Sequence, residues 1–284
     1  MSNALVELSD SLTAAVEAAS AYTLLVDARR RYPASGIAYA PDLVLTADHV
    51  VTREEEIRVG LPDGKTLPAT IAGRDPGSDL ALLRLAEKAL TPAKTASSAR
   101  VGQVVLALGR PSPAGVQASF GIIISISGPS RTWRGGLLDQ FYQTETVPYP
   151  GFSGGPLVDA TGALLGLNTS GLTRGEALTI PVKVAWATAQ SLAEHGAVKR
   201  GYLGVRTQPV ENGLLVLWLE KEGPAEQGGV MVGDILTRVS GQALQDADDL
   251  FSALQGELVG KPVDVEVVRG GQPKTLKVTV GERK

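Results

Sequence analysis

From Tyr22 to about Ile124 the sequence is a succession of short β-rich runs, and this pattern restricts the fold more than any other feature of the chain. The runs are YTLLVDA, GIAYA, LVLTADHVV, EEIRVGLP, TLPATIAG, DLALLRL, QVVLALG and SFGIIISIS. Turn residues separate them, as in Pro-Asp-Gly at 62–64 and Asp-Pro-Gly-Ser at 75–78. Even spacing of short strands predicts a β-sandwich or a β-barrel. Three further strands are expected at DQFYQTET, GPLVD and ALLGLNT.

Helical patterns flank this β region, and a second domain follows it. Residues 4–20 carry a helix-like spacing rich in Ala and Leu, and VKVAWATAQSLAEH carries another that ends at Gly196. Residues 201–284 alternate strands with helical pieces at 224–229 and 246–256. We therefore expect a helical segment at 1–20, a mainly β domain at 21–198 and a smaller α+β domain at 201–284. The apolar run GLLVLWLE is expected to be buried between neighbouring strands.

Composition excludes several classes of function. The chain has no cysteine and only two histidines, so disulfides, thiolate catalysis and Cys- or His-based metal sites are excluded. The net charge of −3 implies no nucleic-acid partner, and the RGG triplets that begin at Arg134 and Arg269 are interpreted as turns. No run approaches the ~18 apolar residues of a membrane span. The N-terminus lacks a secretory pattern, so the sequence as written predicts a cytoplasmic protein, or an envelope protein whose leader is missing.

The run PGFSGGPLVD, at 150–159, places a single serine among glycines. Glycine opens backbone angles that let main-chain N–H groups converge on one point. Ser153 is therefore a candidate nucleophile, and a serine hydroxyl needs a nearby base. His49 follows an apolar strand and is the preferred base. His195 lies in the last turn of a helix, where a charged imidazole would complement the helix dipole.

The segment RDPGSDLALLRL offers two candidates for the carboxylate that would orient His49. Asp75 precedes Pro-Gly and is typical of a turn. Asp79 opens a buried strand, where an acid is costly unless it is paired. The resulting order of His49, Asp79 and Ser153 is that of the chymotrypsin-like proteases. In such a double barrel the base and acid come from the first barrel and the serine from the second, and a boundary near residues 110–117 (RPSPAGVQ) is expected.

TADHVV, DLALLRL and GFSGGPLV resemble the three catalytic blocks of the HtrA/Deg serine proteases. AEHGAVKRGYLGV resembles that family's junction into a PDZ domain, and GPAEQGGVMVGDIL resembles a PDZ core segment. The likeness covers nearly the whole chain after the first twenty residues. It implies a chymotrypsin-like double β-barrel followed by one PDZ domain, and an ATP-independent endopeptidase acting on unfolded or damaged proteins. No cofactor is implied, and the chain carries no Walker-type loop.

The resemblance also implies roles for residues. His49 would act as base and then acid, Asp79 would hold its tautomer, and Ser153 would attack the scissile carbonyl. Backbone N–H groups of Gly151 and Ser153 would form the oxyanion hole. Leu178, Thr179 and Ile180, in ALTIP, would form the substrate strand and a pocket wall that favours small or medium aliphatic residues. Peptide C-termini would bind the PDZ domain beside GLLVLWLE, with their carboxylate on Tyr202, Leu203, Gly204 and Val205.

The sequence departs from the family pattern at three places. The block before His49 is shortened relative to the usual Gly-Ser-Gly approach, since it is Pro33-Ala34-Ser35-Gly36 here. Phe152 stands where the family commonly has Asn, which leaves open whether the oxyanion hole is formed at rest. The family's long loop that regulates the trimer would fall near Arg29-Arg30-Arg31, where there is almost no insertion. A large cage built on that loop is therefore not expected, and the family resemblance implies a homotrimer through the N-terminal segment.

A second hypothesis comes from a different class of protein. Phe152 could have spoiled the site, which would leave a catalytically silent peptide-binding or chaperone-like protein on a protease scaffold. The candidate triad argues against this hypothesis because an unused triad has no evident packing value.

Overall fold

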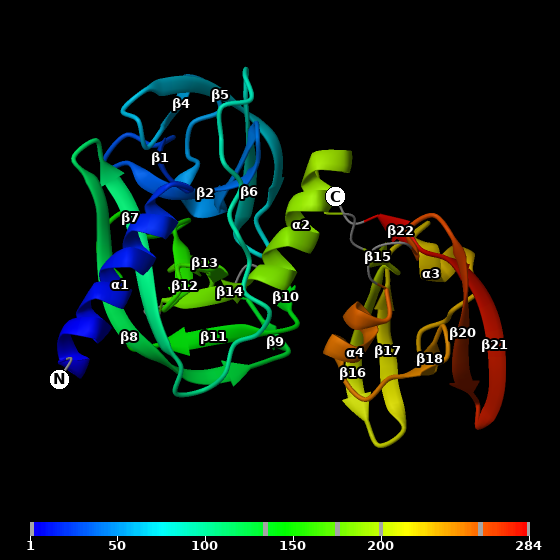
Figure 1. The fold of residues 1–284 in the computed structure, drawn as a ribbon. Helices are drawn as coiled ribbons and strands as arrows, with labels where there is room; N and C mark the ends of the chain where they lie inside the picture. The colour runs from blue at the N-terminus through cyan, green and yellow to red at the C-terminus, as the bar shows by residue number, and fades with distance from the viewer. Residues whose placement is uncertain (1–2, 133–135, 174–176, 199–200, 255–257, 283–284) are drawn as a thin grey trace. The chain divides into compact units, whose positions relative to one another are not determined.

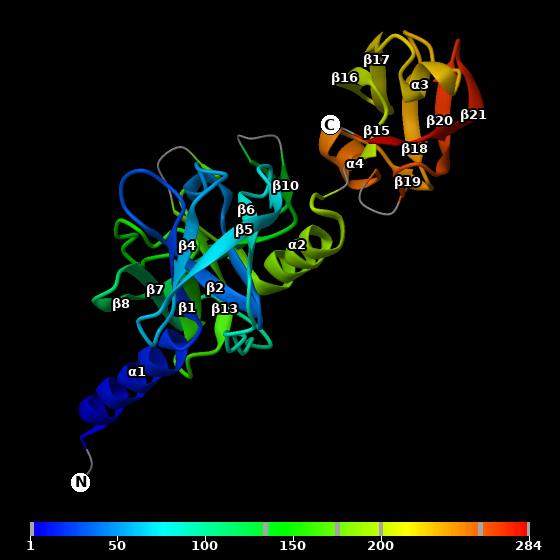
Figure 2. The ribbon, with the colours of Figure 1, turned by 90° about the horizontal axis from the view of Figure 1, so that it is seen from above.

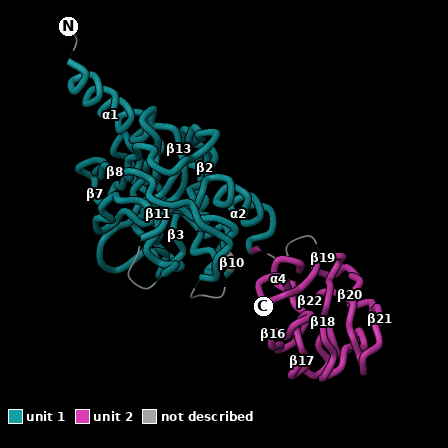
Figure 3. The backbone as a smooth tube through the Cα atoms, turned by 90° about the horizontal axis from the view of Figure 1, so that it is seen from below, with its two compact units in different colours: residues 1–197 teal, residues 198–284 magenta. Residues whose placement is uncertain are grey.

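The computed structural model describes residues 3–132, 136–173, 177–198, 201–254 and 258–282. The described chain forms two compact units, residues 1–197 and 198–284 (Figure 3). The RGG triplet at Arg134 lies outside the described residues. No described helix is long and apolar enough to cross a membrane.

The first half of unit 1 is a closed six-stranded barrel with the order β1-β2-β3-β6-β5-β4 (Figure 1). Its interior is filled by aliphatic side chains such as Leu24, Ile37, Leu45 and Leu82, each fully buried. All neighbouring strands are antiparallel. The strands are β1 (Thr23–Asp27), β2 (Ala34–Ala40), β3 (Leu43–Ala47), β4 (Ile57–Gly60), β5 (Thr66–Asp75) and β6 (Leu80–Leu85).

A second closed barrel follows, with the order β11-β14-β13-β12-β7-β8. A short β9–β10 pair, Ser130–Arg131 with Leu137–Leu138, lies outside it. The double barrel implied by the family resemblance is confirmed, and the spacing of the runs, which predicted a sandwich or a barrel, agrees with it. The strands of the second barrel are β7 (Val104–Ser112), β8 (Gly115–Ser127), β11 (Phe141–Thr144), β12 (Pro156–Asp159), β13 (Leu164–Thr169) and β14 (Leu178–Pro181).

The boundary between the barrels does not lie at residues 110–117. Those residues form the end of β7, a turn and the start of β8, and β7 pairs with β8 inside the second barrel. The first barrel ends with β6 at Leu85, so the chain crosses between the barrels within 86–103. The Pro and Gly residues of RPSPAGVQ were interpreted as a linker, but they turn a hairpin, which needs the same residue types.

Two helices pack on unit 1. Helix α1 (Ala4–Ser20) buries only Ala15 and Ala19 in its C-terminal half, and Figure 2 shows its N-terminal half extending away from the barrels. Helix α2 (Val182–His195) ends at Gly196, which has φ +74° and caps the helix with its N–H on Leu192 O. This confirms the helix end predicted from the sequence, with His195 in the last turn.

Unit 2 is a mixed β and α fold around one apolar core that includes Leu214, Val216, Leu236 and Val265. Its main sheet has the order β16-β17-β18-β20-β21. Short helices α3 (Pro224–Gln227) and α4 (Ala247–Ser252) accompany it, and the carboxylate of Asp246 caps α4. The strands are β15 (Gly201–Tyr202), β16 (Val205–Val210), β17 (Gly213–Leu219), β18 (Ile235–Val239), β19 (Gln242–Ala243), β20 (Pro262–Arg269), β21 (Gln272–Thr279) and β22 (Gly281–Glu282).

The prediction that the run GLLVLWLE is buried is correct for only part of the run. Leu214 and Val216 of β17 are buried, but Leu217 and Trp218 are 51% and 45% exposed. The register between β16 and β17 shifts here, because Arg206 pairs with Trp218 and Thr207 pairs with Val216, which leaves Leu217 as a bulge. A bulge redirects side chains by breaking the alternation of faces. The apolar run therefore presents part of its length to solvent.

An ion pair between a buried aspartate and a half-buried arginine joins the end of β20 to the turn before β18. Arg269 donates from Nε and Nη2 to the two oxygens of Asp234, each at 2.7 Å, and Met231 N–H donates to Asp234 Oδ2 at 2.8 Å. The Arg269 hydrogen bond holds the pKa of Asp234 below its usual value. A depressed pKa means that the ionised carboxylate stabilises the fold above the unfolded-state pKa of about 4. This contribution is lost as pH falls through the folded-state pKa.

Asp234→Asn is therefore expected to lower the melting temperature of unit 2 clearly at pH 7 and much less in strong acid. Thermal unfolding of the full chain at both pH values measures the difference. Asp264→Asn is the matched control, because Asp264 and its partner Lys277 are both exposed. Equal decreases in the melting temperature of the two variants at pH 7 would contradict a stabilising role of the Asp234–Arg269 ion pair.

Candidate active site

Asp79 is placed by the turn that precedes β6. The Asp75 carboxylate accepts hydrogen bonds from Gly77 N–H at 3.2 Å and Ser78 Oγ at 2.5 Å, which confirms the turn predicted there. Asp79 follows with φ +55°, a left-handed conformation that aspartate tolerates better than most residues. Its side chain is fully buried. A carboxylate so placed needs hydrogen-bond partners.

His49 supplies two of these partners. It lies in a short 3₁₀ helix, Asp48–Val50, directly after β3. Its backbone N–H donates to Asp79 Oδ1 at 2.9 Å, and its ring Nδ1 lies 2.8 Å from Asp79 Oδ2. With Nδ1 donating to the carboxylate, Nε2 carries the lone pair and is free to act as a base. The structure therefore brings together the histidine and the aspartate that the sequence analysis selected.

Thr169 was not predicted from the sequence, although it completes the environment of Asp79. Its hydroxyl donates to Asp79 Oδ2, and it accepts a hydrogen bond from Gly171 N–H at 2.9 Å. Gly171 is required because a Cβ there would lie 2.5 Å from His49 Nδ1. The chain after β13 thus covers the His49–Asp79 pair. A threonine at a strand end carries no sequence signal that distinguishes this role.

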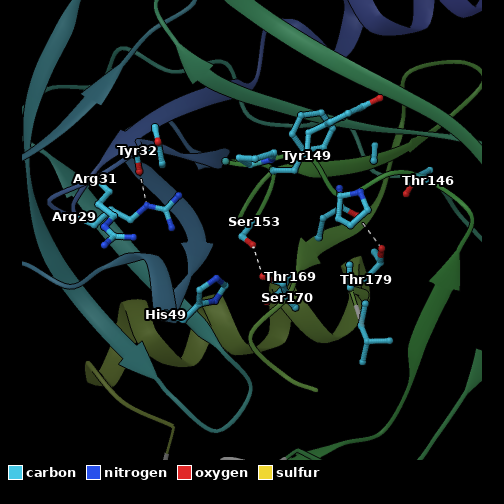
Figure 4. Close-up of a pocket in the computed structure, with 18 of the residues that line it drawn as sticks. Arg29, Arg31, Tyr32, His49, Thr146, Tyr149, Ser153, Thr169, Ser170 and Thr179 are labelled. Carbon is cyan, nitrogen blue, oxygen red and sulfur yellow. Dashed lines mark hydrogen bonds between the residues drawn. The ribbon is translucent and has the colours of Figure 1, made fainter. Parts of the chain in front are cut away.

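Ser153 lies on the turn before β12, in the second barrel. Gly154 follows with φ +85°, and a Cβ on it would meet the backbone N of Ala47 at 3.1 Å. The serine loop is therefore packed against β3, the strand that leads to His49. The Ser153 hydroxyl is hydrogen-bonded to Ser170 Oγ at 3.2 Å and, among the described residues, not to His49 (Figure 4).

Ser35 of β2 fixes the serine loop from the first barrel. Its hydroxyl donates to Gly151 O at 2.6 Å and accepts from Arg110 N–H at 2.8 Å, while its own N–H donates to Ser153 O at 3.2 Å. Ser35 is fully buried. The role of Ser35 was not predicted from the sequence, because its partners Gly151, Ser153 and Arg110 lie far away along the chain.

Residues 149–152 form a turn closed by Phe152 N–H donating to Tyr149 O at 3.0 Å. Pro150 and Gly151 occupy its centre, and Gly151 has φ +91°. Proline followed by a residue with positive φ is the arrangement of a type II turn. The N–H groups of Gly151 and Ser153 make no hydrogen bond to any other described residue. Both donors are therefore available to an oxygen placed beside Ser153.

The side chain of Phe152 packs into the core of the second barrel. It is 2% exposed and lies among residues such as Ala107 and Leu157. Gly109 makes room for it, since a Cβ there would come within 2.6 Å of the ring. The ring also meets Tyr149 edge-on, at 5.5 Å between centroids. Anchoring the side chain in this way leaves the turn before Ser153 undistorted.

A pocket of about 700 Å³ contains both His49 and Ser153. Leu178 and Thr179 of β14 line its wall together with Ala177. Ile180, the third residue expected on this wall, is fully buried and does not line the pocket. Three arginines from the loop between β1 and β2, Arg29, Arg30 and Arg31, line the opposite part of the pocket. No cluster of three metal-ligating side chains occurs among the described residues.

Unit 2 carries the loop expected to bind a peptide carboxylate. Tyr202 ends β15 and Val205 begins β16, with Gly204 between them at φ +75°. The N–H groups of Leu203 and Gly204 donate to no other described residue. The Tyr202 hydroxyl donates to Glu220 Oε2 at 2.7 Å.

The sequence analysis expected a peptide to add as a strand beside GLLVLWLE. The pairing of the strands rules this position out. That run is β17, which pairs with β16 on one side and β18 on the other. Both of its edges are therefore occupied. The sheet order ends at β16, so the open edge next to the loop belongs to Val205–Val210.

Two family models match the chain. Residues 34–167 match a trypsin-like peptidase domain, and residues 201–280 match a PDZ domain. The first range runs from β2 into β13, so it omits β1, the end of β13 and β14, and the second covers most of unit 2.

Individual relatives agree with this division. A probable periplasmic serine endoprotease DegP-like of Ectopseudomonas mendocina is 35% identical over 261 residues, which cover 85% of this chain and 54% of the relative. The chain thus spans about half the length of the curated relatives it matches. Two solved structures cover it almost completely. The HtrA-type protease AlgW with tripeptide is 31% identical, with TM-score 0.81, and covers 96% of this chain and 97% of that one. The serine endoprotease from Yersinia pestis is 29% identical, with TM-score 0.82, and covers 96% and 98%.

Proposed function

Because the chain belongs to the HtrA-type serine proteases, we propose that it is an ATP-independent endopeptidase that cleaves unfolded or damaged polypeptides. The observation that carries the proposal is the bonding of His49 to Asp79 through both its backbone N–H and Nδ1. This double attachment fixes the ring so that Nε2 faces the pocket that contains Ser153. An oriented base beside a serine is the requirement for acyl transfer.

In the proposed reaction His49 removes the proton from Ser153 as the hydroxyl oxygen attacks the scissile carbonyl. His49 then returns that proton to the leaving amine, and water repeats the sequence on the acyl-enzyme. Asp79 keeps Nδ1 protonated throughout. In the resting structure the Ser153 hydroxyl points to Ser170, so the attack requires rotation about the Ser153 side chain toward His49.

The oxyanion of the tetrahedral intermediate would be held by Gly151 N–H and Ser153 N–H. The support is their lack of other partners and the type II turn at Pro150–Gly151. Loss of one such donor typically costs ~10²–10³ in rate. Leu178 and Thr179 would contact the residue before the cut, and the wall they form with Ala177 suits small or medium aliphatic side chains.

In unit 2, the N–H groups of Leu203 and Gly204 would bind a peptide C-terminus, and the peptide would extend the sheet along β16. The solved structures of AlgW contain a decapeptide or a tripeptide, which supports a peptide ligand here. Partners would therefore be unfolded chains and peptide C-termini.

A homotrimer through the N-terminal segment is proposed on the apolar surface of α1. Leu5, Val6 and Leu8 are 76%, 52% and 47% exposed, and exposed apolar residues in series mark interaction surfaces. The curated relatives are named periplasmic and do not support the cytoplasmic reading. We therefore propose that the protein works in the cell envelope.

The silent peptide-binding alternative is not favoured. It depended on Phe152 disturbing the oxyanion hole, whereas this side chain is anchored in the second barrel.

Digestion of casein tests the proposal. The wild type is expected to cleave unfolded casein without ATP, with small or medium aliphatic residues before the new C-termini. Ser153→Ala is expected to be inactive while keeping its melting temperature. A folded wild type that leaves casein intact would contradict the proposed function.

Thr169→Val is expected to lower kcat roughly tenfold with little change in KM. The variant keeps the shape of the side chain but removes one hydrogen bond to a buried carboxylate, and such a bond to a charged group contributes about 1.5–3 kcal/mol. Because the effect acts through Asp79 and His49, it concerns the reaction step and not ground-state binding. Thr70→Val, at an exposed position on β5, is the matched control. An unchanged kcat would show that Thr169 does not position the pair.

A further inference from the structure

The loop between β1 and β2 gives the catalytic pocket a positive wall. Arg29, Arg30 and Arg31 line the pocket that holds His49 and Ser153, and among the described residues that line it there is no Asp or Glu. The whole chain has a net charge of −3. A concentration of positive charge at the site of an acidic protein therefore requires its own explanation.

The three arginines are not equivalent. Arg29 is half-buried and donates from Nε to Tyr32 O and from Nη2 to Pro33 O at 3.4 Å. It braces the loop. Arg30 and Arg31 are exposed and make no hydrogen bond or ion pair with any other described residue. Their guanidinium groups are available to a ligand.

The chemistry indicates which part of a substrate would meet this loop. His49 gives its proton to the leaving amine, so the chain that follows the cut departs on the side of His49. The arginine loop and His49 both come from the first barrel, whereas Thr179 on the opposite wall comes from the second. Figure 4 shows Arg29 and Arg31 on the same side of Ser153 as His49, with Thr179 on the other side.

We propose that Arg30 and Arg31 select substrates with acidic residues shortly after the scissile bond. The inference rests on the proposed protease function and adds a substrate class to the same site. Guanidinium groups bind carboxylates through paired hydrogen bonds. Exposed ion pairs each change an affinity by only a few-fold, so two of them give a preference on the order of tenfold.

Two quenched fluorescent peptides test the proposal with the full chain. They share one sequence up to the cut, with an aliphatic residue before it, and differ in carrying Glu-Glu or Gln-Gln at the second and third positions after it. At low ionic strength kcat/KM is expected to be about tenfold higher for the Glu peptide. At about 1 M salt, where the Debye length is ~3 Å, the ratio is expected to approach one.

Arg30→Gln/Arg31→Gln is expected to bring the ratio close to one at low salt. Arg58→Gln/Arg238→Gln removes the same charge from exposed positions on β4 and β18 and is expected to keep the preference. Thermal unfolding checks that both double variants fold.

The outcomes separate this inference from the proposed function. Cleavage of the Gln peptide at the same rate as the Glu peptide would overturn the inference and leave the protease function standing. A preference that persists in Arg30→Gln/Arg31→Gln would also overturn it. If neither peptide nor casein is cleaved, both the function and the inference fail.

Discussion

Replacing His49 by alanine is expected to lower kcat/KM for a peptide substrate by at least about 10⁴-fold. Among the described residues that line the pocket of Ser153, His49 is the only histidine, and the Ser170 hydroxyl that is hydrogen-bonded to Ser153 is too weak a base to replace it. The fold should survive, because the ring is partly exposed at 19% and lies on a short turn at the barrel surface. Single-turnover cleavage of a fluorogenic peptide measures the loss.

The chain supplies its own control for this experiment. His195, the only other histidine, lies at the exposed C-terminal end of α2. His195→Ala is expected to keep kcat/KM within about twofold of the wild type, since it lies outside the pocket. Comparable losses in the two variants would contradict the assignment of His49 as the base.

Asp79→Asn is expected to lower kcat by about 10⁴-fold while the site keeps its geometry. The His49 backbone N–H needs an acceptor, so the asparagine oxygen would occupy the Oδ1 position. Its NH₂ group would then face His49 Nδ1 and the Thr169 hydroxyl. Nδ1 would have to accept a hydrogen bond, which moves the ring proton to Nε2 and removes the base.

The ring protons of His49, observed by NMR, would show this change of tautomer directly. Asp42→Asn, on the surface ion pair with Arg84, is the matched control and should leave kcat unchanged. If Asp79→Asn kept more than about a tenth of the wild-type kcat, the carboxylate would not be the orienting group.

The sequence predicted those parts of the molecule that depend on local pattern. Short runs separated by Gly and Pro turns indicated a β-sandwich or a β-barrel, and the C-cap Gly196 marked the end of α2. Asp79 could be selected because a carboxylate at the mouth of an apolar strand needs a partner. Each of these signals lies within a few residues of the feature that it predicts.

Features that depend on tertiary contacts were missed or misplaced. Thr169 and Ser35 carry no local signal, since their roles come from partners far away in the sequence. RPSPAGVQ was interpreted as a boundary because hairpin turns and linkers use the same residues. The exposure of Leu217 and Trp218 follows from a bulge that depends on the register with β16, which a single apolar run cannot specify.

The position of Phe152 is another feature that depends on tertiary contacts and could not be predicted from the local sequence. Its place beside the nucleophile put the oxyanion hole in question, yet its consequence depends on the space left by Gly109, over forty residues away. Only the packed barrel shows that the ring points inward and that the N–H groups of Gly151 and Ser153 stay free. The sequence context alone gives more support to a catalytically silent peptide-binding protein than the structure does.

Labelling with a fluorophosphonate tests most directly whether His49, Asp79 and Ser153 act as one unit. The folded protein is expected to gain a single adduct by intact mass, mapped to Ser153, and to lose this reactivity in His49→Ala but not in His195→Ala. A folded wild type that stays unlabelled, or an adduct on another serine such as the neighbouring Ser170, would contradict the account.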